Sequence, residues 1–147
     1  MRGWTQADID KIKSQKKPAF KKDSSYMRTC DEIFMRQFRG KPCEVCASQK
    51  KLNTYRTCGH HIIPKSLSKY LRFARRNIAI VCPGHHQYGR DICAHGTNCL
   101  SVGKFSDWLI ETRPEDYEFL ILHQHDPCPD KYKDMLEIIR RTGEVER

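Results

Sequence analysis

The sequence predicts an α+β fold in which two short strands lie between N-terminal and C-terminal helices. Apolar residues recur at helical spacing before residue 40 and after residue 100. Two short apolar runs rich in β-branched residues lie between them, flanked by paired cysteine and histidine spacings. A chain of 147 residues without an internal repeat has the length of one domain, so we expect a single domain over 1–147. We expect it to comprise a basic helical region over 1–40, a core over 41–99 and a helical region over 100–147.

The charge is unevenly distributed along the chain. Lysine and arginine number 27 against 18 acidic residues; 1–105 hold 21 basic and 7 acidic side chains, whereas 106–147 hold 6 and 11. A basic region is expected to meet a polyanion, although a solvated surface accounts for such charge equally well when it stands alone. No apolar stretch approaches the roughly 20 residues that cross a bilayer, and the N-terminus lacks the apolar segment of a signal peptide. We therefore expect a soluble, cytoplasmic protein without a membrane partner.

Two helices are predicted in the basic N-terminal region. Thr5-x-x-Asp8 is a helix-start signature, and the helix after it fades into Lys11–Lys22, a run with six lysines and no acidic residue. We expect this arm to contact phosphates, with a merely solvated arm as the alternative. A second helix is expected from about Ser24 to Gly40, packed against the cysteine pair that follows it. Its apolar stripe comprises Tyr26, Cys30, Ile33, Phe34 and Phe38.

Two short motifs have the spacing of zinc knuckles. They are Cys43-x-x-Cys46 and Cys82-x-x-His85, and zinc prefers four nitrogen or sulfur ligands in a tetrahedron. In a reducing compartment such pairs favour metal binding over disulfides. We therefore expect a structural Zn²⁺ held by these four residues, with Cys93 and Cys99 as competitors for the fourth position.

Between the knuckles the sequence predicts a strand over 57–63, a basic loop over 64–76, a strand over 77–81 and a short helix over 85–90. Neighbouring helical side chains diverge by about 100°, so His85 is expected to face the zinc and His86 another centre. Adjacent strand residues point to opposite faces, so His60 and His61 can serve one centre only if the strand ends or bulges there. We expect such a break.

These residues together resemble the HNH endonuclease family and its ββα-metal fold. The resemblance rests on Gly59-His60-His61-Ile62-Ile63-Pro64, Asn77 and His86 with the flanking knuckles, and covers about a third of the chain, from Cys43 to His95. The segment Leu71–Ile78 also resembles a loop of phage recombination nucleases of the NinG type. The implied fold is a ββα-metal core with a structural zinc site, surrounded by helices.

The resemblance implies a role for each motif residue. His61 matches the general base that takes a proton from the attacking water. His60 and His86 match ligands of a catalytic divalent ion, Mg²⁺ or Mn²⁺ or a softer metal that imidazole accepts, and Asn77 matches the residue that fixes the loop and the base. The implied products carry 5′-phosphate and 3′-hydroxyl ends.

The sequence departs from the family at two positions. Many members place a further ligand four residues beyond the last motif histidine, where this chain has Arg90. His95 or water is then expected to complete the catalytic metal site. The second departure is His85, which stands where the family usually has cysteine.

The loop between the strands is the expected contact with duplex or branched DNA. It holds five basic residues and no acidic one, and with Arg90 the expected phosphate contacts are Lys65, Lys69, Arg72, Arg75 and Arg76. Tyr70 and Phe73 interleave with them and are expected to anchor the loop, with stacking on an unpaired base as the alternative. His123 and His125 are expected to be ordinary polar residues.

The acidic C-terminal region predicts three helices that scaffold the core. Pro114 opens the second helix and Asp130 is expected to cap the third. The apolar stripes, each expected to be buried, are Phe105, Trp108 and Leu109, then Tyr117, Leu120 and Ile121, then Tyr132, Met135, Leu136 and Ile139.

The predicted function is a metal-dependent DNA endonuclease, acting in the host cytoplasm if the chain is encoded by a phage. Two alternatives stay open: a zinc-stabilised nucleic-acid-binding module without catalysis, and an accessory protein of phage recombination or packaging. Neither alternative requires His61. No heptad or symmetric patch indicates an oligomeric state.

Overall fold

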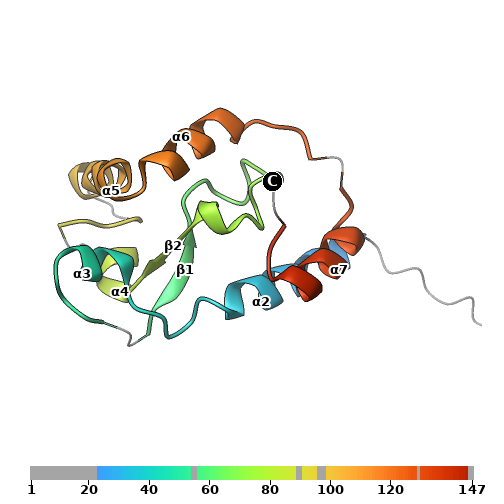
Figure 1. The fold of residues 1–147 in the computed structure, drawn as a ribbon, viewed down its shortest axis with the longest axis horizontal. Coiled ribbons are helices and arrows are strands. Elements are labelled where there is room, and N and C mark those ends of the chain that lie inside the picture. The colour runs from blue at the N-terminus through green and yellow to red at the C-terminus, as the bar shows by residue number, and fades with distance from the viewer. Residues whose placement is uncertain (1–22, 54–55, 89–90, 96–98, 129, 146–147) are drawn as a thin grey trace, which may run out of the picture.

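The computed structural model describes residues 23–53, 56–88, 91–95, 99–128 and 130–145. The predicted helix after Thr5, the arm Lys11–Lys22 and Arg90 lie outside them. The elements are α2 (Asp23–Arg36), α3 (Glu44–Ser48), β1 (Cys58–His61), η1 (Arg75–Asn77), β2 (Ile78–Val81), α4 (Pro83–His86), α5 (Cys99–Thr112), α6 (Pro114–His123) and α7 (Tyr132–Thr142). The fold is α+β, with helices around a small antiparallel sheet (Figure 1).

The sheet consists of β1 and β2, shorter than predicted but at the predicted places. Its register pairs Cys58 with Val81, Gly59 with Ile80, His60 with Ala79 and His61 with Ile78. Directly opposed residues of an antiparallel pair lie on the same face of the sheet. The register therefore assigns each residue of β1 to a face.

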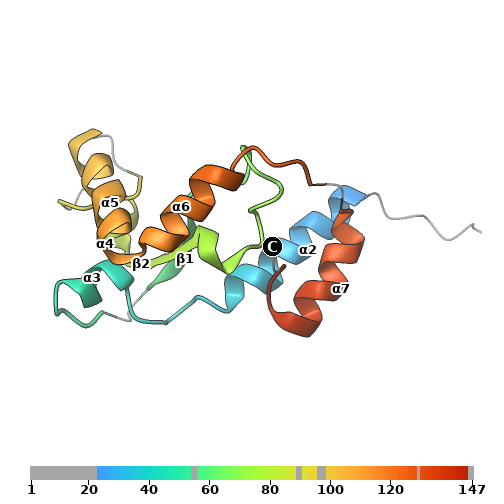
Figure 2. The same cartoon turned by 45° about the horizontal axis from the view of Figure 1, so that its top comes forward.

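Two hydrophobic cores lie on the two faces of β2, which is buried along its whole length. Ile78 and Ile80 belong to the first core, with Cys30, Phe34, Phe38, Phe73, Met135, Leu136, Ile139 and Val145. Ala79 and Val81 belong to the second, with Cys43, Val45, Cys46, Cys82, Phe105, Trp108 and Leu109. The sheet is thus a middle layer between the α2–α7 pair and the elements α3, α4 and α5 (Figures 1 and 2).

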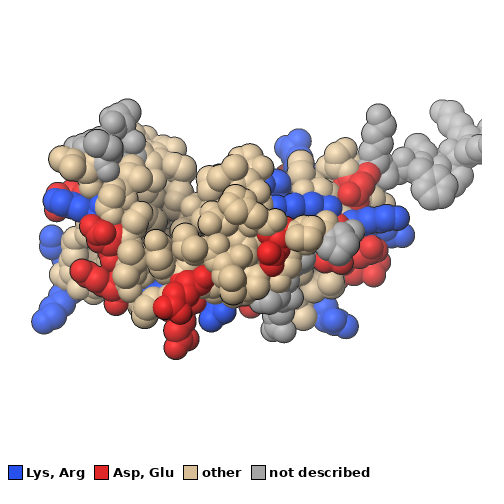
Figure 3. All heavy atoms as spheres, turned by 90° about the horizontal axis from the view of Figure 1, so that it is seen from above, with Lys and Arg blue, Asp and Glu red and all other residues tan. Residues whose placement is uncertain are grey.

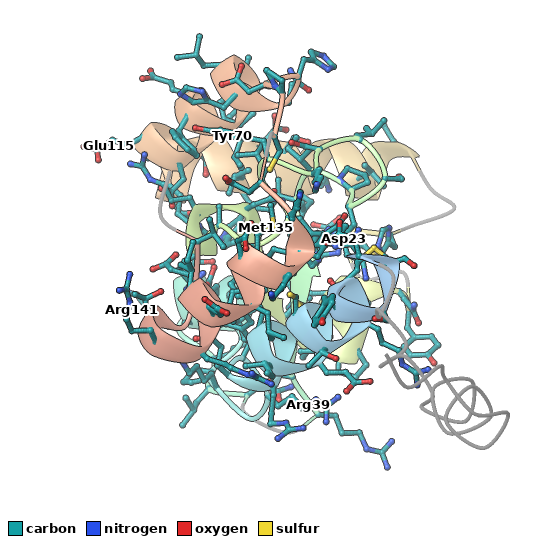
Figure 4. The ribbon with its side chains drawn as sticks, turned by 90° about the vertical axis from the view of Figure 1, so that its right-hand side faces the viewer. Asp23, Arg39, Tyr70, Glu115, Met135 and Arg141 are labelled. Atoms are coloured by element: carbon teal, nitrogen blue, oxygen red, sulfur yellow. The ribbon has the colours of Figure 1, made fainter. Side chains whose placement is uncertain are left out.

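Helix α2 ends at Arg36, before the predicted Gly40, and buries Cys30 and Phe34 of the predicted stripe, with Phe38 buried just after it. It packs against a different partner from the one predicted. It lies beside α7, and Figure 4 looks at this pair, with Asp23 at the start of α2 and Met135 on α7. Cys30 and Phe34 share the first core with Met135, whereas the cysteine pair after α2 belongs to the second core. The expectation that α2 packs against the knuckle is therefore wrong, because β2 separates the two.

The three C-terminal helices form where predicted, with two corrections. The N-cap of α7 is Lys131, which is extended, and not Asp130, because the helix begins one residue later than expected. Ile121 is 49% exposed, because α6 buries only one edge, with Leu120 fully covered. None of the described helices combines the length and the apolar character that crossing a bilayer requires.

Gly59 is the position in the sheet where a side chain has no room. A Cβ there would lie 2.9 Å from Met35 Cε, 3.0 Å from Phe38 Cδ2 and 3.1 Å from Ile78 Cγ2. These atoms belong to α2, the segment after it and β2. Glycine therefore lets the first core close over β1.

We predict that Gly59→Ala lowers the free energy of unfolding in urea by about 1–3 kcal/mol, the cost of overpacking a core. Gly103→Ala is the matched control, because a Cβ at Gly103 on α5 meets nothing within 4 Å. In a helix that change should stabilise by about 0.5–1 kcal/mol. Equal effects at the two sites would show that the close packing at Gly59 does not matter.

Candidate metal centres and active site

The first candidate centre is a buried cluster of Cys43, Cys46, Cys82 and His85. Cys43 is the N-cap of α3 and its thiol accepts the backbone N–H of Cys46, so the short helix presents both thiols together. Cys82 follows β2 as the N-cap of α4, and His85 lies on α4, where its N–H donates to the Cys82 carbonyl at 3.0 Å. All four ligand atoms lie within 4.8 Å of one another.

The distances in this cluster fit a tetrahedral zinc ion. His85 Nδ1 lies 3.5 Å from Cys43 Sγ, 3.5 Å from Cys46 Sγ and 3.3 Å from Cys82 Sγ, and the last two sulfurs are 3.9 Å apart. Ordinary zinc bond lengths in a tetrahedron give about 3.5 Å between sulfur and nitrogen and about 3.8 Å between sulfurs. The cluster is therefore compatible with a structural zinc site.

Burial raises the pKa of the Cys46 thiol to about 12. At Cys46, burial without a cation therefore disfavours the thiolate, whereas a bound metal ion deprotonates a coordinating thiol. Of the two competitors predicted for the fourth position, Cys93 is buried but lies outside the cluster. The side chain of Cys99 lies outside the described part of the chain.

The second candidate centre brings together His60, His86 and His95, whose ligand nitrogens lie within 4.8 Å of one another. The ring of His60 lies 4.5 Å from that of His95 and 5.3 Å from that of His86, between centroids. His60 pairs with Ala79 across the sheet, so it faces the second core, where its ring meets that of Phe105. His95 is exposed, so the cluster reaches the surface.

His95 reaches the cluster because the chain folds back onto α4. The N–H of Ala94 donates to the His85 carbonyl at 2.9 Å, and the N–H of His95 donates to the His86 carbonyl at 2.8 Å. These bonds satisfy carbonyls at the end of α4. The sequence predicted His95 or water as the further ligand, but it carries no signal for the backbone bonds that bring His95 to the cluster.

Helix α4 contributes to both centres, as the predicted divergence of His85 and His86 requires. Its bounds differ from the prediction: it spans Pro83–His86 and not 85–90. Proline is favoured at the start of a helix, and the helix ends at Gln87, where the backbone turns away. One helical turn is enough to aim two neighbouring histidines at different centres.

The imidazole of His60 is held in its neutral form. Burial, followed by the neighbouring His95 and His86, lowers the pKa of His60 to about 3. Burial also lowers the pKa of His86. A neutral imidazole offers the lone pair that a metal ion requires.

His61 lies on the opposite face of the sheet from His60. It pairs with Ile78, and its ring lies against Phe34 of the first core. Its Nε2 lies 2.8 Å from the carbonyl oxygen of Arg72, which can only accept, so Nε2 carries the proton. In the neutral ring Nδ1 then holds the free lone pair. Burial lowers the pKa of His61, and the bond to Arg72 only partly offsets this effect.

The strand ends at His61, as expected, but it stays in register up to that residue, so His60 and His61 lie on opposite faces of the sheet. A shared pocket joins the two histidines instead. It has a volume of about 560 Å³ and is lined by Met35, Gly59, His60, His61, Pro64, Lys65, Ser66, Arg72, His86 and His95. Because three consecutive residues of β1 line it, the pocket follows the edge of β1 that does not pair with β2.

Asn77 is fully buried and ties the end of β1 to the basic loop. Its Oδ1 accepts the N–H of Ile63 at 2.7 Å, and its Nδ2 donates to the carbonyls of Ile63 at 3.0 Å and Leu71 at 3.1 Å. Its own carbonyl accepts the N–H of Ile62. These bonds are those of a residue that holds a loop in place.

The three loop arginines among the expected DNA contacts all make ion pairs within the protein. The pairs are Arg72 with Asp31 at 2.6 Å, Arg75 with Glu44 at 3.1 Å and Arg76 with Asp116 at 2.8 Å. The acidic partners come from α2, α3 and α6. Figure 3 shows basic and acidic side chains intermingled on one face, without a continuous basic track among the described residues.

The two lysines of the loop differ in accessibility. Lys69 Nζ donates to the Asp130 carbonyl at 2.6 Å and lies over the ring of Tyr132. The side chain of Lys65 is 44% exposed and lines the pocket, 3.7 Å from Asp31. Lys65 is thus the accessible loop cation nearest the histidines in the described structure.

The aromatic residues of the loop are both anchors. Phe73 is buried in the first core, and the ring of Tyr70 stacks on that of His123 at 5.8 Å. His123 also lies 2.6 Å from Asp126, so it has a packing role that the sequence did not indicate. His125 is exposed, as expected of an ordinary polar residue.

Comparison with models of known families, with curated proteins and with solved structures finds no match. The function is therefore inferred from the geometry of the two centres.

Cys82→Ser is predicted to abolish zinc binding and unfold the protein. Structural zinc contributes about 10–16 kcal/mol of apparent binding energy. This is at least as large as the free energy of unfolding of a typical domain, about 5–15 kcal/mol. Elemental analysis and thermal unfolding provide the measurement. Cys128→Ser, a cysteine outside the cluster, should keep one zinc per chain. A folded Cys82→Ser variant with undiminished zinc would exclude this site.

Proposed function

We propose that this protein is a metal-dependent DNA endonuclease of the HNH type. The proposal is carried by one observation: a single pocket is lined both by a histidine fixed through a backbone carbonyl, His61, and by a cluster of three further histidines. A zinc-binding module would need the cysteine cluster but not this arrangement. General-base hydrolysis requires a positioned base beside a metal ion.

His60, His86 and His95 are the residues that would hold the catalytic ion. When bound, such an ion stabilises the negative charge that develops on the phosphate and on the leaving oxygen. Three imidazole ligands fit a transition metal better than Mg²⁺, which prefers oxygen ligands. Mg²⁺ and Mn²⁺ stay candidates, because water and phosphate oxygens would supply further ligands.

His61 is the proposed general base. With Nε2–H donated to the Arg72 carbonyl, Nδ1 is free to take a proton from water, whose oxygen then attacks the phosphorus. The bond from phosphorus to the 3′ oxygen breaks, which leaves 5′-phosphate and 3′-hydroxyl ends. Burial keeps the imidazole neutral at physiological pH, because it lowers the pKa of His61. The base is therefore ready before substrate binds.

Lys65 is the proposed phosphate contact at the pocket. The ion pairs of Arg72, Arg75 and Arg76 leave these arginines less available to DNA. Lys65 has only a long contact with Asp31, at 3.7 Å, and much of its side chain is exposed. The arm Lys11–Lys22 and Arg90, which lie outside the described residues, stay proposed DNA contacts.

The decisive variants are His61→Ala and His86→Ala, with His125→Ala as a matched control away from the pocket. His61→Ala should keep zinc, fold and DNA affinity but lose cleavage by about 10²–10⁴-fold, the range for a positioned general base. His86→Ala should also lose cleavage, and extra Mn²⁺ should restore part of it, because this change weakens the ion site. The measurement is conversion of supercoiled plasmid to nicked circles.

The control should nick plasmid as fast as the parent. If both pocket variants also do so, the nuclease proposal is wrong, and any cleavage in the preparation comes from a contaminant. If the parent binds DNA without cutting it, a zinc-stabilised binding module replaces the nuclease.

Lys65→Ala is predicted to weaken DNA binding alike for unrelated sequences and to reduce the slope of log affinity against log salt by about 0.9, the contribution of one phosphate contact. Lys104→Ala is the control, because Lys104 pairs with Asp91 outside the pocket. The measurement is a fluorescence-anisotropy titration at several salt concentrations. An unchanged slope for Lys65→Ala would move the phosphate contact to another residue.

A further inference from the structure

Asp31 of α2 pairs with Arg72, the residue whose carbonyl accepts a hydrogen bond from His61. The Arg72 guanidinium donates from Nε to Asp31 Oδ1 at 3.0 Å and from its terminal nitrogen to Oδ2 at 2.6 Å. This is a two-point, charge-assisted contact, the strongest form of side-chain hydrogen bonding. The Arg72 side chain is 11% exposed and that of Asp31 21%, so water screens the pair only weakly.

The rigidity of α2 makes Asp31 a fixed point. Its neighbours along the helix, Cys30 and Phe34, are completely buried in the first core. The ring of Phe34 also lies against His61, so the same helix contacts the base directly and, through Asp31 and Arg72, indirectly. No residue of α2 belongs to the region that resembles the HNH family.

The loop around Arg72 has a separate tether at each of three consecutive residues. The Leu71 carbonyl accepts from Asn77 at 3.1 Å, and the Phe73 carbonyl accepts from the Val145 N–H at 3.0 Å. The Arg72 carbonyl, between them, is used to accept the hydrogen bond from His61. The Arg72 residue is therefore held through its side chain. Its side chain is tied to Asp31 and packs between the rings of Phe73 and Tyr132.

We propose that Asp31 is a positioning residue for the general base, which it orients through Arg72. The route is continuous: carboxylate to guanidinium, along the Arg72 residue to its carbonyl, and from there to Nε2 of His61. This inference rests on the proposed nuclease function for its catalytic consequence. The geometric part, that Asp31 fixes the His61 ring, stands independently of it.

The catalytic test is Asp31→Asn, which keeps size and removes charge. An amide can accept only one of the two guanidinium bonds and turns N–H groups toward the other, so the Arg72 carbonyl should shift. We expect kcat for plasmid nicking to fall about 10- to 100-fold, as for other orienting partners, with KM within about twofold. Asp116→Asn is the matched control, since Asp116 pairs with Arg76, is 23% exposed and lies outside the pocket.

Asp116→Asn should leave kcat unchanged. Both variants should keep one zinc per chain and unfold at similar temperatures, which separates orientation of the base from loss of fold. An unchanged kcat in Asp31→Asn, or a loss of the same size in Asp116→Asn, overturns the proposal.

A double-mutant cycle tests the route through His61. If Asp31 acts through the base, Asp31→Asn should cause no further loss in a chain that already carries His61→Ala, because the two changes remove one function. An equal loss in both backgrounds would show that Asp31 acts elsewhere, for example through Lys65, and would overturn the proposal.

A spectroscopic measurement keeps the inference separate from the proposed function. In the zinc-loaded parent, nitrogen NMR of labelled histidines should show His61 as a single tautomer with its proton on Nε2. Asp31→Asn should shift or broaden that signal, and Asp116→Asn should not. An unmoved signal in Asp31→Asn overturns the positioning role even if the parent cuts no DNA. Absence of cleavage with a moved signal contradicts only the nuclease proposal.

Discussion

The pairing of β1 with β2 is the constraint on which the arrangement depends. Because opposed residues share a face, the register places His60 with Ala79 over the second core and His61 with Ile78 over the first. A slip of one residue would exchange the two histidines between faces. The pocket can use both faces only because it follows the free edge of a strand in a two-stranded sheet. The close approach of α2 to Gly59 on the same strand keeps this register tightly packed.

The two candidate metal centres are coupled through α4. His85 and His86 are consecutive, and the carbonyls of both receive bonds from the returning chain at Ala94 and His95. A helix of one turn has little stability of its own, so the cysteine cluster at its start must hold it in place. Zinc at the first centre would therefore also fix two of the three ligands of the second. This arrangement explains how so short a helix can carry ligands of two centres.

Local patterns predicted those features that depend on local chemistry. The knuckle spacing predicted the cluster of Cys43 and its partners, and helical divergence predicted that His85 and His86 serve different centres. The partner of α2 and the ion pairs of the basic loop could not be predicted, because Asp31 and the other acidic partners lie far from the loop in sequence. The sequence of the loop contains no acidic residue, so its arginines were expected to be available to phosphates. In the folded protein, carboxylates from other elements pair with them instead. His95 was predicted as an alternative to water at the catalytic metal site, but the backbone bonds that bring it back to α4 carry no local sequence signal.

We propose that the protein hydrolyses DNA at the pocket beside His61, with a divalent ion held by the histidine cluster. The most direct measurement incubates the zinc-loaded parent with supercoiled plasmid, first with no added divalent ion and then with Mn²⁺ or Mg²⁺, and identifies the ends produced. Nicked circles should appear only when the added ion is present, with 5′-phosphate and 3′-hydroxyl termini. Intact plasmid at every ion concentration, with the protein folded and bound to DNA, would contradict it.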